Sequence, residues 1–371
     1  MALPLHDSGP IELDTEEQAW LAHQPFLYSR GYQLRPRYRP NWVPSWTPGF
    51  HYDAEDALLL PFRGGVVIDA TRISDGKMVY IKKVRRGSEE LAIVTYLYSE
   101  ESRGDAQNRC VPILDVLDPP QDPTISLMVM PFLRYIDSPK FERVEDILQC
   151  GRQLLEGLVF LHAHDVAHRD CSFKNLMMDA SALHPLGHHP IQYDYLASDY
   201  SRRAPVLSRA VARVKYYFTD FGISTRFAPG AENRLVLGDK GLDKELPELS
   251  LVVPYDPFKA DVFLLGNVFR KHFVEKYRNA PMLDMGQLVA RMTAPDPKQR
   301  PTAAGALREW QALQKRTSAV SRGWRLQPQD DSESLLVRVI YDVVQPFCLV
   351  YAYLKLAYYF ALPLLPLSSR R

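Results

Sequence analysis

The sequence predicts an α+β protein in which a small sheet-rich part precedes a larger helical part. Two β-branched runs, 66–73 and 77–84, flank an Asp-Gly turn, which is typical of a β-hairpin. Apolar residues recur at helical spacing over 145–162 and again from 261 to about 313. Strands that come first and helices that come later indicate segregated layers rather than alternating βαβ units.

The other elements of the first part follow from local pattern. A helix is expected from Ser88, which is a good N-cap residue and is followed by Glu89 and Glu90 in the first turn. Two further apolar runs, 111–117 and 125–133, are expected to form strands. Residues 1–54 are rich in proline and aromatic residues and show no sustained helical or strand period, so we expect an ordered extension.

Composition excludes several classes of protein. The chain has 371 residues, of which 46% are apolar, so it can bury a sizeable core and is not disordered as a whole. Its 45 basic and 44 acidic residues nearly cancel, which gives no long-range field to attract a nucleic acid. Arginines alternate with aromatic residues near position 37, a pattern that also fits RNA, but Trp42 and Trp46 favour docking on a neighbouring part of the chain. We therefore expect no nucleic-acid partner.

Cysteine spacing and the chain ends bear on compartment. The four cysteines are scattered without a CxxC pair, which predicts neither a disulfide framework nor a zinc knuckle and suits a reducing compartment. The N-terminus lacks the basic and apolar regions of a secretory signal. Residues 343–367 form an apolar segment with Lys355 as its only charge. Its length suits a membrane, whereas the central lysine and two late prolines argue against spanning, so membrane contact and packing on the main domain both stay open.

Short motifs in a fixed order carry the functional prediction. HRDCSFKN stands at 168–175 after an expected helix, and DFG stands at 220–222 after the strand-like run VKYYFT. VYIK at 79–82, MVMPFL at 128–133 and a Pro-Glu pair at 247–248 agree with this order, as does a DPxxRP segment ending at Pro301. Together they resemble the eukaryotic protein kinases over residues 55–315. PRYRPNWVPSW, VAHRDC and VPYDPFKAD are more closely similar to kinase-like proteins expanded in mushroom-forming fungi.

The resemblance implies a bilobal kinase fold. A small β-rich lobe would extend to about residue 133 and a larger helical lobe to about residue 315, with 1–54 as an extension and 316–371 as a tail. It also implies ATP and Mg²⁺ as cofactors, a protein hydroxyl as acceptor, and a cytoplasmic catalytic domain. The oligomeric state stays undetermined.

The same resemblance assigns the site. Asp170 would be the catalytic base, Lys82 would hold the α- and β-phosphates with Glu90 fixing its ammonium, and Lys174 would reach the γ-phosphate. Asn175 and Asp220 would hold Mg²⁺, because oxygen ligands suit hard cations. The remaining implied positions line the ATP site or shape the scaffold: Gly65, Val67, Met130 and Phe132 for ATP, and His168, Arg169, Phe221, Gly222, Glu248, Asp261 and Arg300 for structure, with Glu248 paired to Arg300 and Asp261 holding the catalytic-loop backbone.

Three departures from the kinase pattern leave alternatives open. Leu60 and Phe62 replace the first two glycines of the phosphate loop, so phosphate cover is expected to be poorer. Tyr80 stands where kinases have alanine against the adenine. Ser172 and Lys174 leave the choice between Ser/Thr and Tyr acceptors undetermined. A pseudokinase, acting as a nucleotide-binding or non-enzymatic scaffold, is therefore the alternative function.

Two segments of the expected helical lobe are unusual. Residues 176–219 are far longer than the usual kinase connection, so we expect an insertion at about 180–214 that forms an extended surface loop for a partner; its histidines lack a convincing zinc set. Residues 226–247 contain no Ser, Thr or Tyr that could be phosphorylated to bind Arg169. Either a carboxylate fills that role or the loop is already ordered, and the candidate carboxylates are Glu232, Asp239 and Asp243.

Overall fold

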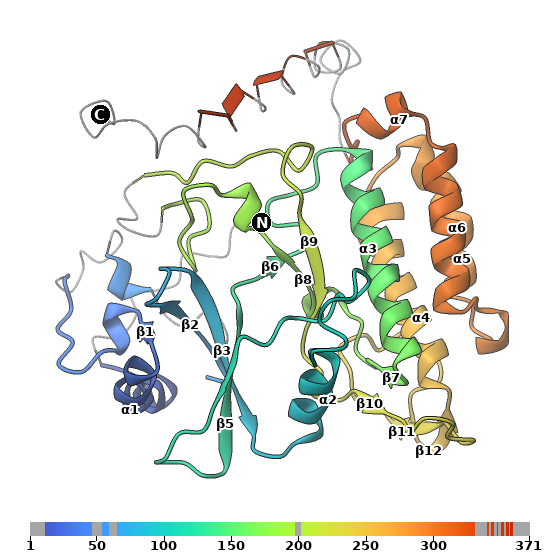
Figure 1. The fold of residues 1–371 in the computed structure, drawn as a ribbon. Helices are drawn as coiled ribbons and strands as arrows, with labels where there is room; N and C mark the ends of the chain where they lie inside the picture. The colour runs from blue at the N-terminus through green and yellow to red at the C-terminus, as the bar shows by residue number, and fades with distance from the viewer. Residues whose placement is uncertain are drawn as a thin grey trace. The chain divides into compact units, whose positions relative to one another are not determined.

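The chain forms two compact units, which are described separately. The computed structural model describes residues 12–46, 54–58, 65–196 and 202–330, together with a few positions between 340 and 358. The first unit is built on an antiparallel sheet and comprises Met1–Leu91, Pro112–Leu133 and His184–Val206; the second is mainly helical and comprises Ala92–Val111, Arg134–Leu183 and Leu207–Arg371. The fold is thus mixed α and β with the two kinds of element segregated, as an α+β class requires (Figure 1).

The sheet of the first unit has five antiparallel strands. They are β1 (Tyr32–Leu34), β2 (Val67–Arg72), β3 (Met78–Arg85), β4 (Asp115–Leu117) and β5 (Ile125–Pro131), in the spatial order β1-β2-β3-β5-β4. The predicted hairpin is confirmed as β2 and β3, with Ile68 opposite Ile81 and Gly76 in the left-handed region at φ +70°. The strands expected at 111–117 and 125–133 are present over the shorter ranges of β4 and β5.

Residues 1–54 show no sustained period in the sequence, but their described part has regular elements. They contain the helix α1 (Thr15–Ser29), the strand β1 and a 3₁₀ turn (Pro36–Tyr38), with a second 3₁₀ turn (Glu55–Ala57) just beyond. Asp14 caps α1 and forms a reciprocal capping box with Glu17. The apolar spacing of the sequence did not indicate this helix, because its buried face mixes polar residues with Trp20 and Leu27. Those polar residues bind the chain that follows: the Gln24 side-chain oxygen accepts the Leu34 N–H at 2.9 Å.

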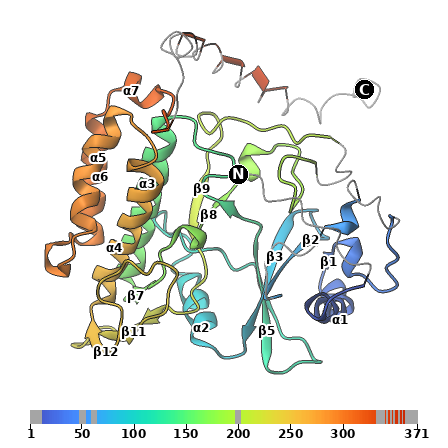
Figure 2. The ribbon, with the colours of Figure 1, turned by 180° about the vertical axis from the view of Figure 1, so that it is seen from behind.

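The two faces of this sheet have different neighbours. Ile68, Val79, Ile81, Leu127 and Val129 point to one face, where α1 and the segment after it supply Trp20, Leu27, Tyr32, Leu34 and Tyr38 to a closed hydrophobic core. Figure 2 shows α1 lying beside β1 on this side of the sheet. Because side chains alternate along a strand, Tyr80 and Lys82 of β3 point to the opposite face.

The second unit contains the predicted helices. The pattern at 145–162 is confirmed as α3 (Val144–Ala163), and the pattern from 261 to about 313 corresponds to α4 (Pro257–Phe269), α5 (Ala280–Met292) and α6 (Ala303–Arg316). A π-helical turn (Arg270–Val274) follows α4, a 3₁₀ turn (Pro297–Gln299) precedes α6, and a short α7 (Ala319–Gly323) ends the group. The helices α3, α4, α5 and α6 lie side by side (Figure 1). The predicted helix after Ser88 is present as α2 (Glu89–Leu97).

Close packing of α3 on α6 depends on one glycine. Trp310 of α6 is fully buried, and its indole N–H donates to the Leu148 carbonyl of α3 at 2.9 Å. A Cβ atom at Gly151 would lie 2.1 Å from the Trp310 ring. Only glycine therefore lets the tryptophan lie against the helix backbone.

Short strands connect these helices and place the motifs. β6 (Arg134–Tyr135), β8 (Leu176–Asp179) and β9 (Lys215–Phe218) form one antiparallel sheet in the order β6-β8-β9. β7 (Val166–Ala167) pairs with β10 (Thr225–Arg226), and β11 (Val236–Gly238) pairs with β12 (Ser250–Tyr255). Two 3₁₀ turns, Phe173–Asn175 and Ser181–Leu183, flank β8. Asp179 pairs with Lys215, so the residues between them connect neighbouring strands.

Most of the C-terminal apolar segment 343–367 falls outside the described residues, and the positions that are described, between 343 and 358, are helical. Leu60 and Phe62 of the phosphate loop also lie outside them. Among the residues that are described, no helix combines the length and the apolar character needed to cross a bilayer.

Candidate active site

The loop that carries HRDCSFKN is held by one buried carboxylate. It runs from β7 to β8, and Arg169 within it adopts the left-handed region at φ 67°. Asp261 of α4 is completely buried and accepts the His168 and Arg169 backbone N–H groups at 2.8 and 2.6 Å. His162 of α3 contacts the same carboxylate at 3.0 Å. The sequence predicted that Asp261 holds the backbone of this loop, and these two hydrogen bonds confirm it.

Asp170 lies inside this loop with both carboxylate oxygens engaged. Its side chain accepts the Asn175 amide N–H on Oδ2 and the Leu242 backbone N–H on Oδ1, each at 2.9 Å. The residue is only 8% exposed. A carboxylate offers about four acceptor positions. A substrate hydroxyl could thus still bind Asp170, in an orientation limited by the two existing donors.

The two residues implied as metal ligands come from the same end of the β8/β9 hairpin. Leu176 pairs with Phe218, and Thr219 donates its backbone N–H to the Asn175 carbonyl at 2.9 Å. Asp220 follows at once, with an exposed side chain and a left-handed φ of 61°. Asn175 turns its amide nitrogen toward Asp170. A carboxylate and an amide oxygen are the kinds of donor that fit Mg²⁺.

Phe221 and His168 form the buried support below this end. Phe221 is 1% exposed and its ring lies 4.8 Å from the fully buried His168 ring. Burial lowers the pKa of His168, in spite of the opposing charges of Asp261 and Asp170. A neutral imidazole fits the contacts, because its Nε2 lies 3.1 Å from the Thr219 carbonyl and its Nδ1 faces the Asp170 backbone N–H at 3.3 Å. Gly222 follows with its backbone N–H 3.4 Å from the Asp220 carboxylate.

In the first unit, Lys82 and Glu90 form the expected pair. The Lys82 ammonium lies 2.5 Å from the Glu90 carboxylate, and the two side chains are 14% and 12% exposed. Lys83, the next residue on β3, points to the other face and lies 4.1 Å from the centre of the Trp20 ring. The short sequence separation of Lys82 and Glu90 thus does not prevent the pair.

The turn before β2, which the sequence resemblance implies as the end of a phosphate loop, is held by α1. Gly65 has φ +55°, and its carbonyl accepts the Trp20 indole N–H at 2.8 Å. A Cβ atom there would lie 2.8 Å from the Glu16 side chain, so glycine is required by α1 as well as by the turn. Val67 begins β2 and pairs with Lys82 in register.

Aromatic residues close the sheet face near Lys82. Tyr80 and Phe132 are 5% and 8% exposed, and their rings stack at 4.3 Å. Met130 lies opposite Tyr80 on β5 and is also buried. His188 meets the edge of Phe132 at 5.5 Å. Tyr80 therefore occupies, with Phe132, the part of the sheet where a smaller side chain would leave space.

Residues 184–196 of the insertion differ in part from the expected extended surface loop, because its three histidines are not at the surface. His184, His188 and His189 are buried, at 4%, 4% and 1% exposure, because they pack with aromatic and acidic residues of the first unit. Over the described residues, no group of three or more His, Cys, Asp or Glu side chains has a metal-binding arrangement.

Arg169 is held without the carboxylate proposed from the sequence. Its guanidinium donates to the Thr225 hydroxyl at 3.1 Å and to the Leu237 carbonyl at 2.7 Å. Asp243 instead accepts from the Asn267 amide at 2.9 Å. Glu232 and Asp239 are both among the described residues, and neither forms an ion pair with Arg169 there. Of the two sequence hypotheses, the already ordered segment agrees with these contacts.

The remaining scaffold positions also have defined contacts. Glu248 and Arg300 form a two-pronged ion pair at 2.6 and 2.8 Å, in which the Arg300 side chain is fully buried. Lys174 is exposed beside Asn175 on the loop that carries HRDCSFKN. Its position leaves the ammonium accessible to solvent.

Sequence reasoning missed three groups that shape this loop. The Leu242 N–H on Asp170 is a backbone donor and carries no residue-type signal. Ser224 donates its hydroxyl to the His168 carbonyl at 3.0 Å, and His162 supports Asp261. Both lie close to the recognised motifs, but nothing in their spacing identifies their partners.

No protein-family model matches the chain.

Proposed function

We propose that the chain is a protein kinase that transfers the γ-phosphoryl group of ATP to a protein hydroxyl. The observation that carries the proposal is the catalytic loop: Asp170 faces Asn175 on a backbone held by the buried Asp261, and Asp220 lies at the adjacent strand end. The Lys82–Glu90 pair adds the phosphate-binding cation that the same chemistry needs. The two units are proposed to correspond to the two lobes of a kinase fold, as in the kinase-like proteins expanded in mushroom-forming fungi.

The residues divide the work by charge. Asp170 would orient the acceptor hydroxyl and take its proton as the hydroxyl oxygen attacks the γ-phosphorus, while the bond from that phosphorus to the β–γ bridging oxygen breaks and ADP leaves. Lys82 would bind the α- and β-phosphates, and the exposed Lys174 would bind the γ-phosphate as a point charge. Asn175 and Asp220 would hold Mg²⁺, which neutralises the phosphate charge when bound.

The test is transfer of labelled γ-phosphate from Mg²⁺-ATP to the chain itself and to mixed peptides. Asp170→Asn and Lys82→Ala are each expected to lower transfer by at least about 100-fold, since each removes one catalytic element. Matched controls are Asp284→Asn on α5 and Lys77→Ala in the β2/β3 turn, both exposed. Equal transfer by wild type and Asp170→Asn would refute the proposal, and phosphoamino-acid analysis would identify the acceptor.

One observation favours the alternative, a pseudokinase. Tyr80, Phe132 and His188 are packed together on the Lys82 side of the sheet. If Mg²⁺-ATP binds to the wild type but no transfer exceeds that of Asp170→Asn, a nucleotide-binding scaffold becomes the better description. Phosphorylated acceptor would exclude it.

A further inference from the structure

A segment of the insertion covers the Lys82 side of the sheet in the first unit. Residues 184–196, here called the histidine cap, place His188 against Phe132, which stacks on Tyr80. All three side chains are less than a tenth exposed. Since Tyr80 and Lys82 share one face of β3, the cap lies on the face that the proposed function assigns to nucleotide.

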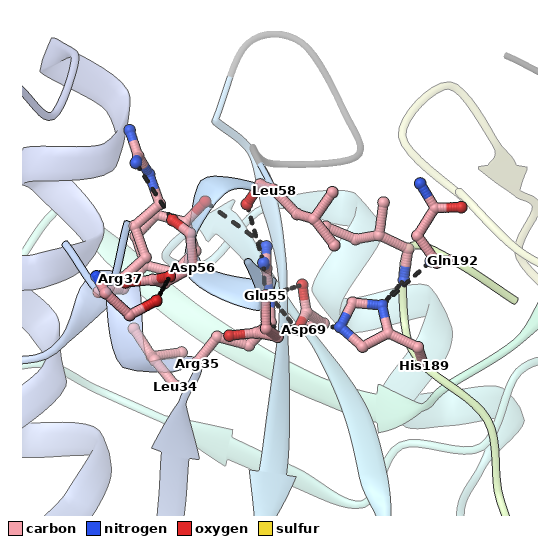
Figure 3. Close-up of polar contacts among 12 residues, drawn as sticks. Leu34, Arg35, Arg37, Glu55, Asp56, Leu58, Asp69, His189 and Gln192 are labelled. Atoms are coloured by element: carbon pink, nitrogen blue, oxygen red, sulfur yellow. Dashed lines mark hydrogen bonds and ion pairs between the residues drawn. The ribbon is translucent and has the colours of Figure 1, made fainter. Parts of the chain in front are cut away.

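A chain of polar contacts fastens the cap to the sheet (Figure 3). His189 lies 3.4 Å from Glu55, Glu55 lies 3.5 Å from Arg35, and Arg35 binds Asp69 of β2 at 2.9 Å. Asp69 is opposite Tyr80 in the β2/β3 register, so both ends of the chain of contacts reach the same sheet face. The two contacts of Glu55, with His189 and with Arg35, are both longer than the Arg35–Asp69 contact, and the Glu55 side chain is 27% exposed.

The cap has its own internal order. The His189 Nδ1 accepts the Ile191 and Gln192 backbone N–H groups at 3.2 and 3.0 Å, which leaves Nε2–H to donate to Glu55. His188 Nδ1 lies 2.9 Å from the His189 carbonyl. A segment with its own hydrogen bonds, joined to the sheet through a partly exposed carboxylate, can move away from the sheet as a unit.

We propose that the histidine cap is an autoinhibitory element that closes the nucleotide-facing side of the sheet, so that Mg²⁺-ATP binds only when the cap is displaced. The inference rests on the proposed function, because it takes nucleotide as the ligand of the Lys82 face. Tyr80 and Phe132 are the surfaces that the cap protects, and the His189–Glu55 contact is its latch.

The test measures Mg²⁺-ATP affinity of the full chain by titration calorimetry. His188→Ala and Glu55→Gln, which loosen the cap from its two sides, are each expected to lower the Kd about tenfold, the change produced when the open form rises from about a tenth of the molecules to nearly all. The matched control is Leu186→Ala, because Leu186 lies in the cap but is 49% exposed. Hydrogen exchange at Ile191 and Gln192 should rise in Glu55→Gln and stay unchanged in Leu186→Ala.

The outcomes separate the two proposals. Tighter binding in both loosened variants, with faster exchange in Glu55→Gln, supports the cap. Equal Kd values in the wild type and the loosened variants would overturn the proposal that the cap is autoinhibitory. If Lys82→Ala then weakens Mg²⁺-ATP binding in each of these backgrounds, the nucleotide site stays in place. Absence of binding in every variant, Tyr80→Ala included, would overturn the proposed function and the cap with it. Circular dichroism of each variant shows that it is folded.

Discussion

Two buried carboxylates, one in each unit, hold the chain in different ways. Asp261 of the second unit is fully buried and accepts two backbone N–H groups of a loop, with His162 as a third neighbour. Asp69 of the first unit is 2% exposed and binds the guanidinium of Arg35. The first arrangement fixes a backbone conformation through neutral donors, and the second joins two distant segments through a charge pair.

The difference decides what a sequence can reveal. The partners of Asp261 are backbone groups, which are always present, so only the motif order was needed to place the carboxylate. Asp69 needs one particular side chain, and that side chain lies in a segment whose pattern predicted no regular element. The comparison also has an energetic side, because an unpaired buried charge costs more than an unpaired buried amide.

The N-terminal segment should be essential to the first unit, and Trp20→Ala tests this most strongly. Its indole is fully buried in the sheet core and donates to Gly65. We expect a loss of about 3–5 kcal/mol in the free energy of unfolding, the usual cost of removing a buried tryptophan. Urea unfolding followed by circular dichroism measures it. Tyr28→Ala in the same helix is the control, since Tyr28 is 57% exposed; similar losses in both would show that α1 is not part of the core.

Removal of Arg35 should show the cost of a buried charge. Arg35→Met leaves Asp69 without its guanidinium, and we expect a loss of about 3–5 kcal/mol. The double variant Arg35→Met with Asp69→Leu should recover most of this loss, because neither charge of this pair is then left buried without the other. Unfolding of the single and double variants in urea gives both values. A double variant as unstable as the single one would mean that Arg35 acts through its other contacts and not through Asp69.

Much of the fold was predictable, for identifiable reasons. The β2/β3 hairpin follows from a Gly76 turn between β-branched runs, and α3 follows from its apolar spacing. α1 was missed because Glu17 and Gln24 lie on its buried face, where a period search expects apolar residues. Those polar side chains are satisfied by partners that only the folded chain brings near, such as Arg37 at 2.7 Å from Glu17.

The candidate site also contains features that the sequence predicted and features that it did not. Lys82 with Glu90, Glu248 with Arg300, and the contacts of Asp261 were placed by motif order, since each motif fixes its own spacing. The burial of His188 and His189 could not be predicted, because their partners come from segments far away in sequence and a histidine-rich stretch normally suits solvent.

The backbone-holding carboxylate should be less costly to remove than the charge pair is to break. Asp261→Ala leaves the His168 and Arg169 N–H groups without their acceptor, and we expect a loss of about 2–4 kcal/mol, because the buried His168 N–H costs about 1–3 kcal/mol when unsatisfied and the part-buried Arg169 N–H costs less. Asp261→Asn keeps one acceptor oxygen and should lose less. Urea unfolding ranks the two variants. A loss larger than that of Arg35→Met would reverse the energetic order that separates the two carboxylates.

The smallest effect is expected at Glu55, the exposed end of the Asp69 charge chain. Burial acts to raise the pKa of Glu55, but the hydrogen bond with His189 and the charge of Arg35 outweigh it and hold the pKa below its ordinary value of 4.5. A carboxyl whose pKa is lower in the folded state stabilises the fold above the unfolded-state pKa and loses that contribution as pH falls through the folded value. Wild type should thus exceed Glu55→Gln by at most about 1 kcal/mol at about pH 7 and by less below about pH 4. Urea unfolding at both pH values measures the difference. The exposed Glu101→Gln serves as the control and should show no such change. A wild-type advantage that grows on acidification would mean that Glu55 is held protonated by its burial, and the latch would then not contain an ionised carboxylate.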